Sequence, residues 1–477
     1  MALALVLVPL AFALLAALYP DGARRPWIVP AGAVAQGFVL LATMHAPPVE
    51  GAFGWLRLDD LGKLVLGLTW SVFFVSALYA PAYLRQRRDR DNRVFTACLL
   101  AFDAMLALIA EAHHLGLMWV ALEAATLAGA PLLYFNRNQR SLEATWKYLV
   151  VGSVGVALAL FGSLFLAYSE LQASLPSSLL FEDLLRVAPL LSKPWLHAAF
   201  VILFIGYGTK MGLAPMHTWK PDAYGEAPGL VGALMAGGLT NCAFLAIVRF
   251  FGITHAAGDD AFARRLLISA GLLSMGVAGA FMVRQRDYKR LLAYSSVEHM
   301  GILVFGLGIG GAGVFGALLH MVNNGFTKAV LFLSAANIHR AFGTKNVEEV
   351  SGALRRVPAS GALLLAGFFA VTGSPPFGPF LSEFTIISSA FSQGRYGLAA
   401  TFLVLLVIVF VAMGTVVVNL VQGEPSSRAS STSFRDEPGT IAPILLALAV
   451  VVMLGVWVPS PLRRLIGAAA AGLGGAS

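Results

Sequence analysis

The amino-acid sequence predicts an all-α polytopic membrane protein with about fourteen transmembrane helices. The chain is 58% hydrophobic and only 12% charged, whereas soluble domains have a charged fraction of about 25%. Apolar runs of about 20 residues recur along nearly the whole chain, and this length crosses a hydrocarbon core of about 30 Å. The basic residues lie in short loops between these runs, so the net charge of +8 indicates membrane orientation rather than a nucleic-acid surface.

The predicted spans follow the apolar runs in order. The first run has no basic segment before it, so we expect a retained helix rather than a cleaved signal peptide. A stretch rich in Ser, Pro and charge, residues 422–439, predicts a mobile loop before the last span. The spans are residues 2–19, 27–44, 62–84, 94–111, 115–135, 146–168, 197–221, 229–251, 265–283, 290–310, 313–337, 360–391, 397–421 and 440–458.

Two of these spans contain clusters of helix-breaking glycines and prolines, at residues 206–215 and 373–379. Broken backbone at membrane depth is tolerated only inside protein or beside a hydrated cavity. The two breaks lie an odd number of helices apart, so the second set of helices would run in the opposite direction, and we predict an inverted repeat. The predicted division is residues 1–93 for the N-terminal helices, 94–251 for the first five-helix repeat, 265–421 for the inverted second repeat, 422–439 for the mobile loop and 440–477 for the C-terminal helix and tail.

The loops that would share one side of the membrane hold most of the loop arginines and lysines, with Lys220 counted among them. The positive-inside rule makes this side cytoplasmic, so both termini are expected outside.

A few charged residues lie inside the apolar runs. A charge at mid-membrane costs roughly 2.5–3.5 kcal/mol or more on insertion scales, so each exception needs a role. Glu123 lies near the middle of its run, and Lys210 lies just before the first break. Because a buried lysine releases its proton readily and a nearby carboxylate favours its charged form, a Glu123–Lys210 pair would bind or release a proton as the separation changes. The structural alternative is a static ion pair that holds helices together.

A second group of buried polar residues lies in the C-terminal half. His320 and Lys328 are eight positions apart, so they share roughly one helix face with Asn324 between them. Histidine titrates nearest neutral pH, which favours a proton relay along this face. Glu383 follows the second break and is a candidate exit or gating acid.

Other polar residues in the runs are assigned less directly. Glu298 and His299 are candidates for a lateral proton-input branch, although polar residues near helix ends often contact only loops. His217 follows the first break and is expected to couple the broken helix to the relay. Asp103 receives no role, and Arg249 is expected to snorkel as an interfacial anchor.

Motifs for other chemistry are missing from the sequence. The two cysteines, Cys98 and Cys242, lie inside apolar runs without a CxxC or Cys/His cluster, so we predict no metal site. There is no Walker motif, GxGxxG, HExxH or nucleophile elbow. We therefore expect no cofactor in this chain and no catalysis by the chain alone.

Two stretches resemble signatures of a known family. Residues 210–228 read Lys-Met-Gly-Leu-Ala-Pro-Met-His-Thr-Trp-Lys-Pro-Asp-Ala-Tyr-Gly-Glu-Ala-Pro, and residues 287–301 read Asp-Tyr-Lys-Arg-Leu-Leu-Ala-Tyr-Ser-Ser-Val-Glu-His-Met-Gly. Both resemble the antiporter-like subunits of respiratory complex I, Mrp sodium/proton antiporters and energy-converting hydrogenases. The resemblance covers roughly residues 50–420. It implies the fourteen-helix fold with inverted repeats, a Glu123–Lys210 pair, and Lys328 and Glu383 on a central polar axis.

Several departures place the chain within that family. Asn241 stands where complex I subunits usually have a lysine, and Glu298 where they often have a serine. Glu383 stands where the distal complex I subunit has a lysine, and Lys220 replaces the usual leucine of a Trp-Leu-Pro-Asp motif. These features are most similar to the F component of hydrogenase-4-type complexes. The change at Asn241 leaves one relay station open: water or Asn241 bridges it, or the central path differs.

The resemblance implies a proton-translocating membrane subunit of a redox-driven complex, hydrogenase-4-like or complex I-like, in a bacterial or archaeal inner (plasma) membrane. Its partners would be other membrane subunits and a peripheral redox arm that performs electron transfer. The alternatives are a Na⁺/H⁺ antiporter subunit, a membrane module that energises inorganic carbon uptake, and a structural anchor whose charges only fix helix packing. The transported ion, H⁺ or Na⁺, is left open.

Overall fold

The structure is a computed structural model that describes residues 2–44, 50–51, 54–87, 89–425 and 432–475. Each predicted span coincides with a helix or with consecutive helices. The helices of these spans are α1 (Ala2–Leu18), α2 (Ile28–Met44), α3 (Asp60–Arg85), α4 (Arg93–Glu111), α5 (Leu115–Leu133), α6 (Gln139–Gln172), α8 (Lys193–Met211), α9 (Trp219–Glu226), α10 (Gly229–Leu234), α11 (Thr240–Ala256), α12 (Asp260–Met282), α13 (Tyr288–Ile309), α14 (Ala312–Phe342), α16 (Pro358–Val371), α17 (Gly378–Ser392), α18 (Tyr396–Val421) and α19 (Pro438–Val456).

The predicted polytopic helical class is confirmed at a coarse level. Over the described residues, ten helices are long and apolar enough to cross a membrane, and α1 and α16 are apolar but shorter. The count of about fourteen crossings therefore stays a prediction. Short elements that we did not predict are α7 (Phe181–Val187), α15 (Ala353–Arg356), α20 (Ser460–Ala471) and a two-stranded antiparallel sheet of β1 (Glu50–Gly51) and β2 (Leu56–Arg57).

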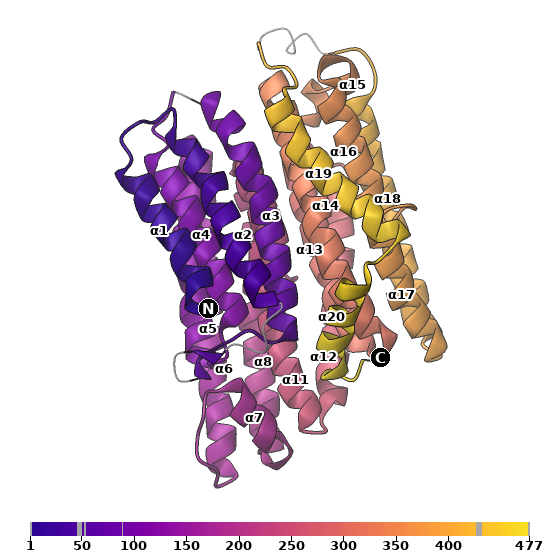
Figure 1. Cartoon of the computed structure of the whole chain (residues 1–477). Helices are drawn as coiled ribbons and strands as arrows, with labels where there is room; N and C mark the ends of the chain where they lie inside the picture. Colours follow the sequence, from indigo (N-terminus) through magenta and orange to yellow (C-terminus); the bar gives the residue numbers. More distant parts are fainter. Residues whose placement is uncertain (1, 45–49, 52–53, 88, 426–431, 476–477) are drawn as a thin grey trace.

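The helices form two groups that lie side by side, as Figure 1 shows. Helices α1 to α8 lie on one side, and α12 to α20 lie on the other. Helix α3 joins the groups, because it packs against α2 and α4 and also against α14, α19 and α20.

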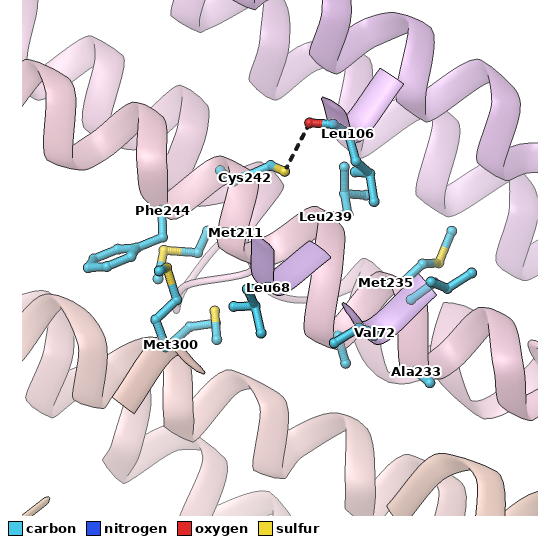
Figure 2. Close-up of a cluster of buried hydrophobic side chains, with 14 of the residues drawn as sticks. Leu68, Val72, Leu106, Met211, Ala233, Met235, Leu239, Cys242, Phe244 and Met300 are labelled. Atoms are coloured by element: carbon cyan, nitrogen blue, oxygen red, sulfur yellow. Dashed lines mark hydrogen bonds between the residues drawn. The ribbon is translucent and has the colours of Figure 1, made fainter. Parts of the chain in front are cut away.

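The centre of the molecule is an apolar core around α10 and α11, which are buried from Gly229 to Thr254. Figure 2 shows labelled side chains of α3, α4, α8 and α13 around this segment. The Cys242 thiol donates a hydrogen bond to the Leu106 carbonyl oxygen at 3.9 Å, and no disulfide joins the two cysteines. A helix that is apolar on all sides belongs in an interior, so polar groups on these helices need partners within the protein. The labelled residues are Leu68, Val72, Leu106, Met211, Ala233, Met235, Leu239, Cys242, Phe244 and Met300.

Two predicted helices are broken at the expected glycines. Helix α8 ends at Met211, Gly212 adopts a left-handed φ of +79°, and helical structure resumes only at Trp219 in α9. Helix α16 ends at Val371, Gly373 has a φ of +65°, and α17 starts at Gly378. A third irregularity, a π-helical turn at Met235–Leu239 between α10 and α11, was not predicted from the sequence.

The predicted mobile loop at residues 422–439 lies partly outside the described residues, which exclude 426–431. Its described end makes specific contacts. The Asp436 carboxylate accepts hydrogen bonds from the Ala359 and Ser360 amides at 2.9 and 3.2 Å. These bonds fasten this end of the segment to the start of α16.

Arg249 is not the interfacial anchor that we expected. Its guanidinium donates to both carboxylate oxygens of Asp59 at 3.0 Å, and its side chain is buried. Asp59 also accepts from the Gly62 amide at 2.8 Å and so caps α3. A buried guanidinium needs a counter-charge, and the partly exposed Asp59 at the start of α3 supplies it.

We expect Asp59→Ala to lower the stability of the protein strongly. The change removes an N-cap, which contributes about 1 kcal/mol, and leaves the buried Arg249 charge unpaired, which costs about 3–5 kcal/mol. Thermal unfolding in detergent, followed by tryptophan fluorescence, measures the loss. The matched control is Asp60→Ala, one residue along and exposed, which should change the melting temperature little. Equal losses in both variants would contradict the role of the ion pair.

Candidate functional site

Lys210 lies in the last turn of α8 and is completely buried. Its ammonium donates a hydrogen bond to the Thr126 hydroxyl of α5 and lies 4.7 Å from the centre of the Tyr148 ring. Gly152 leaves the space, since a Cβ there would lie 3.1 Å from the Lys210 nitrogen. A buried cation needs such partners because it has lost its hydration.

Glu123 lies one helical turn before Thr126 on α5, so the two side chains share a face. Its Oε1 accepts a hydrogen bond from Ser153 at 2.6 Å, and its Oε2 has no protein partner. No direct ion pair joins the Glu123 carboxylate and the Lys210 ammonium among the described residues. Each of the two charged groups of the predicted pair bonds to a hydroxyl instead.

Lys328, on α14, is bound in a similar way in the other half of the molecule. Its buried ammonium donates to the Ser295 hydroxyl of α13 at 2.5 Å. Glu298 lies one turn after Ser295 on α13 and is nearly fully buried. In both clusters a lysine bonds to a hydroxyl that lies one turn from a glutamate on the neighbouring helix. The order along the chain is glutamate then hydroxyl in α5, and hydroxyl then glutamate in α13.

A hydrogen-bonded histidine pair follows Glu298. His299 Nε2 lies 3.8 Å from the Glu298 carboxylate, and His299 Nδ1 lies 2.8 Å from His320 Nε2. The other ring nitrogen of His320, Nδ1, lies 2.9 Å from the Ser382 hydroxyl of α17. Each imidazole can accept a proton on one nitrogen while it releases one from the other. Both rings are completely buried.

Glu383 ends this line of groups. Its carboxylate lies beside the left-handed turn of Gly373, where a Cβ would collide with it. One oxygen, Oε1, is buried without a protein partner. The ligand atoms of His299, His320 and Glu383 lie within 4.8 Å of one another. These three side chains are a chemically reasonable metal set. Three of the four imidazole nitrogens already bond to each other or to Ser382, and His299 Nε2 has no hydrogen-bond partner; the hydrogen-bonded part fits a proton relay.

The structure does not bring all of the predicted residues together. His217 is buried in the break after α8, faces Phe281 and Tyr294 with ring centres 6.3 and 6.2 Å away, and makes no described hydrogen bond to His320 or Lys328. Asp103 lies apart in α4, where Gln36 contacts it.

Two buried amides on the predicted axis have unsatisfied groups. The Asn241 amide nitrogen donates to the Gly237 carbonyl at 2.8 Å within its own helix, and its oxygen has no partner. Asn324, beside Lys328 in α14, has no protein partner for either polar atom. Buried polar groups normally find a partner, so these amides mark places suited to bound water.

We did not predict the hydroxyls that bind the charged and imidazole side chains, Thr126, Ser153, Ser295 and Ser382. A usable signal was present for two of them, because Thr126 and Ser295 lie three residues from a glutamate inside an apolar run. The prediction that Lys220 lies in a loop is wrong. Lys220 is not a loop residue but is completely buried in the first turn of α9, because the break after α8 directs the chain back into the protein.

Comparison with known proteins identifies the family. Residues 112–409 match the family described as NADH:quinone oxidoreductase/Mrp antiporter, transmembrane. The chain belongs to this family. The expected resemblance is therefore confirmed, and the family together with the apolar helices makes the chain a multi-pass membrane protein.

The proteins that are similar to this chain come from several kinds of complex. The chain is 35% identical to the hydrogenase-4 component F homolog of Methylacidiphilum infernorum, over 89% of each chain. It is similar to a chain of respiratory complex I from Thermus thermophilus, with 25% identity, a TM-score of 0.78 and coverage of 96% and 97%. A chain of the Mrp complex from Dietzia sp. shares the fold, with a TM-score of 0.86 at 19% identity and coverage of 99% and 97%.

We expect Gly373→Ala to disturb the position of Glu383. A left-handed φ strains any residue with a Cβ by about 1 kcal/mol, and a collision with a packed neighbour adds about 1–3 kcal/mol. The matched control is Gly394→Ala, at a φ of +70° with no atom within 4 Å of the new Cβ. Melting temperatures of the two purified variants should differ, with Gly373→Ala lower. If both variants melt together, Gly373 does not make room for the carboxylate.

Proposed function

We propose that this chain is the proton-translocating membrane subunit of a redox-driven complex of the hydrogenase-4 or complex I kind. The observation that carries the proposal is a series of buried ionisable and hydroxyl groups in the second half of the molecule, in which hydrogen bonds join Lys328 to Ser295 and the two histidines to each other and to Ser382. It runs from Lys328 and Glu298 through the two histidines to Glu383. Lys210 and Glu123 form a comparable cluster in the first half.

The geometry suits proton transfer by short steps. A proton that reaches His299 from Glu298 passes from His299 Nδ1 to His320 Nε2 over 2.8 Å. His320 then releases the proton of its Nδ1 toward Ser382 or the nearby Glu383. Like charges repel each other, so a protonated Lys328 disfavours protonation of the histidine pair. Deprotonation of one cluster therefore favours protonation of the next. Transport gains a direction when a partner subunit changes the protonation of the first cluster.

This proposal includes the arrangement of the whole chain in the membrane. It has about fourteen crossings and an inverted repeat that relates the two broken helices. Both termini lie outside a bacterial or archaeal plasma membrane. The two broken helices, each interrupted at a glycine with a left-handed φ, support the repeat. The chain would work with other membrane subunits and a peripheral arm that transfers electrons, and it would bind no cofactor itself.

A Na⁺/H⁺ antiporter subunit is the second candidate, favoured by the shared fold with the chain of the Mrp complex. Purification of the tagged chain from its own cells separates the candidates. Co-purifying redox subunits support the first proposal, and co-purifying small antiporter subunits without redox centres support the second. Transport that requires Na⁺ in vesicles also supports the second.

The decisive experiment measures proton pumping by the purified complex in vesicles. Redox turnover drives the complex, and a pH-sensitive dye inside the vesicles records proton movement. We expect Lys210→Met and Glu383→Gln to lower pumping by roughly tenfold or more, because each removes a group that must gain and lose a proton. The control is Lys193→Met, which removes an exposed lysine from the first turn of the same helix as Lys210. Full pumping by both Lys210→Met and Glu383→Gln would refute the proposal.

A further inference from the structure

Lys220 occupies a position that none of the assigned roles explains. Its side chain is completely buried and runs across Gly212, where a Cβ would lie 2.6 Å from Lys220 Cδ and 3.0 Å from its nitrogen. The ammonium donates to the Met211 carbonyl oxygen at 2.8 Å and approaches the Ser296 carbonyl oxygen at 3.4 Å. These contacts place the Lys220 nitrogen between the broken end of α8 and the middle of α13.

The surroundings of Lys220 are poor for a permanent charge. Among the described residues, its nitrogen makes no ion pair with a carboxylate. Two carbonyls and the Tyr224 ring, whose centre is 5.8 Å away, are the neighbours that the structure gives it. A buried charge without a counter-charge is strongly destabilising. A lysine in such a site readily exists as the neutral amine, which is how buried lysines act as bases.

The contacts of Lys220 connect the two lysine clusters. Met211 directly follows Lys210, which bonds to Thr126. Ser296 directly follows Ser295, which accepts the hydrogen bond from Lys328. Asn241, in contrast, uses its amide nitrogen within its own helix, and an amide does not gain or lose a proton at ordinary pH.

Lys220 and Glu383 each lie beside a helix break in the same kind of site. In each break a glycine with a left-handed φ, Gly212 or Gly373, leaves the room that an ionisable side chain fills. Each side chain comes from the helix that follows the break, α9 or α17. The second break thus supplies the last group of the proposed relay, and the first break supplies Lys220 by the same construction.

We propose that Lys220 is the relay residue that carries protons between the Lys210 cluster and the Lys328 cluster. This inference rests on the proposed function. The neutral Lys220 amine accepts a proton that leaves the Lys210 side and becomes an ammonium ion held by the Met211 and Ser296 carbonyls. It then donates one proton toward the Lys328 side and returns to the amine, so no net charge stays on Lys220 after a cycle.

The test uses the vesicle assay of the purified complex with two substitutions. Lys220→Met removes the titrating group and the carbonyl contacts, whereas Lys220→Arg keeps a cation beside the carbonyls but cannot release its proton. We expect both variants to retain redox turnover and to lose proton pumping by roughly tenfold or more. The matched control is Lys289→Met, a second buried lysine that donates to a backbone carbonyl, that of Ala227, at 2.6 Å. It should assemble and pump close to normally.

The outcomes separate the inference from the proposed function. If Lys220→Arg pumps normally, Lys220 is only a cation that caps the end of α8, and the inference is wrong even if Lys220→Met fails to assemble. If Lys220→Met assembles and pumps normally, the inference is also wrong. In both cases, loss of pumping in Lys210→Met and Glu383→Gln would leave the proposed function standing. If those two variants pump normally as well, the proposed function itself fails.

Discussion

The high free energy of a charge inside an apolar interior constrains every other feature of this protein. A bilayer core provides no water for an ammonium or a carboxylate, so each buried charge requires hydrogen bonds from the protein or must lose its charge. Lys210 and Lys328 meet this requirement through a hydroxyl on a neighbouring helix. The glutamates lie one turn away rather than in direct contact, so each lysine is stabilised without being locked in a permanent ion pair.

The same constraint accounts for the broken helices. A regular helix satisfies its own backbone and leaves little room beside its axis for a long polar side chain. Gly212 and Gly373 end helices with a left-handed turn and have no Cβ, and the polar ends of Lys220 and Glu383 lie in the space thus left. The freed carbonyls are useful as well, because that of Met211 accepts a hydrogen bond from the Lys220 ammonium. Backbone irregularity and buried charge therefore occur together for one physical reason.

A charged residue that does not exchange protons has a different kind of partner in this fold. Arg249 cannot lose its proton, and the structure gives it a bidentate carboxylate, Asp59, at the end of α3. The groups proposed to move protons instead have hydroxyl, imidazole or carbonyl neighbours and several unsatisfied atoms, such as Glu383 Oε1. An ion paired with a carboxylate is held in one state, whereas a group with mainly uncharged neighbours changes its protonation at a smaller cost. This contrast distinguishes the structural charge from the charges assigned to transport.

Local patterns in the sequence were enough to predict the helical membrane class and the positions of the long helices. Apolar runs, the charged residues within them and the glycines and prolines that interrupt them are local properties of the chain. They also indicated the family, through motifs that are continuous in sequence. The packing of distant helices was needed to establish that the histidines bond to each other, that Ser295 receives Lys328 and that Lys220 lies inside. These facts depend on helices far apart in the chain, and a one-residue rotation of either helix would change them without altering the apolar pattern that predicts the helices.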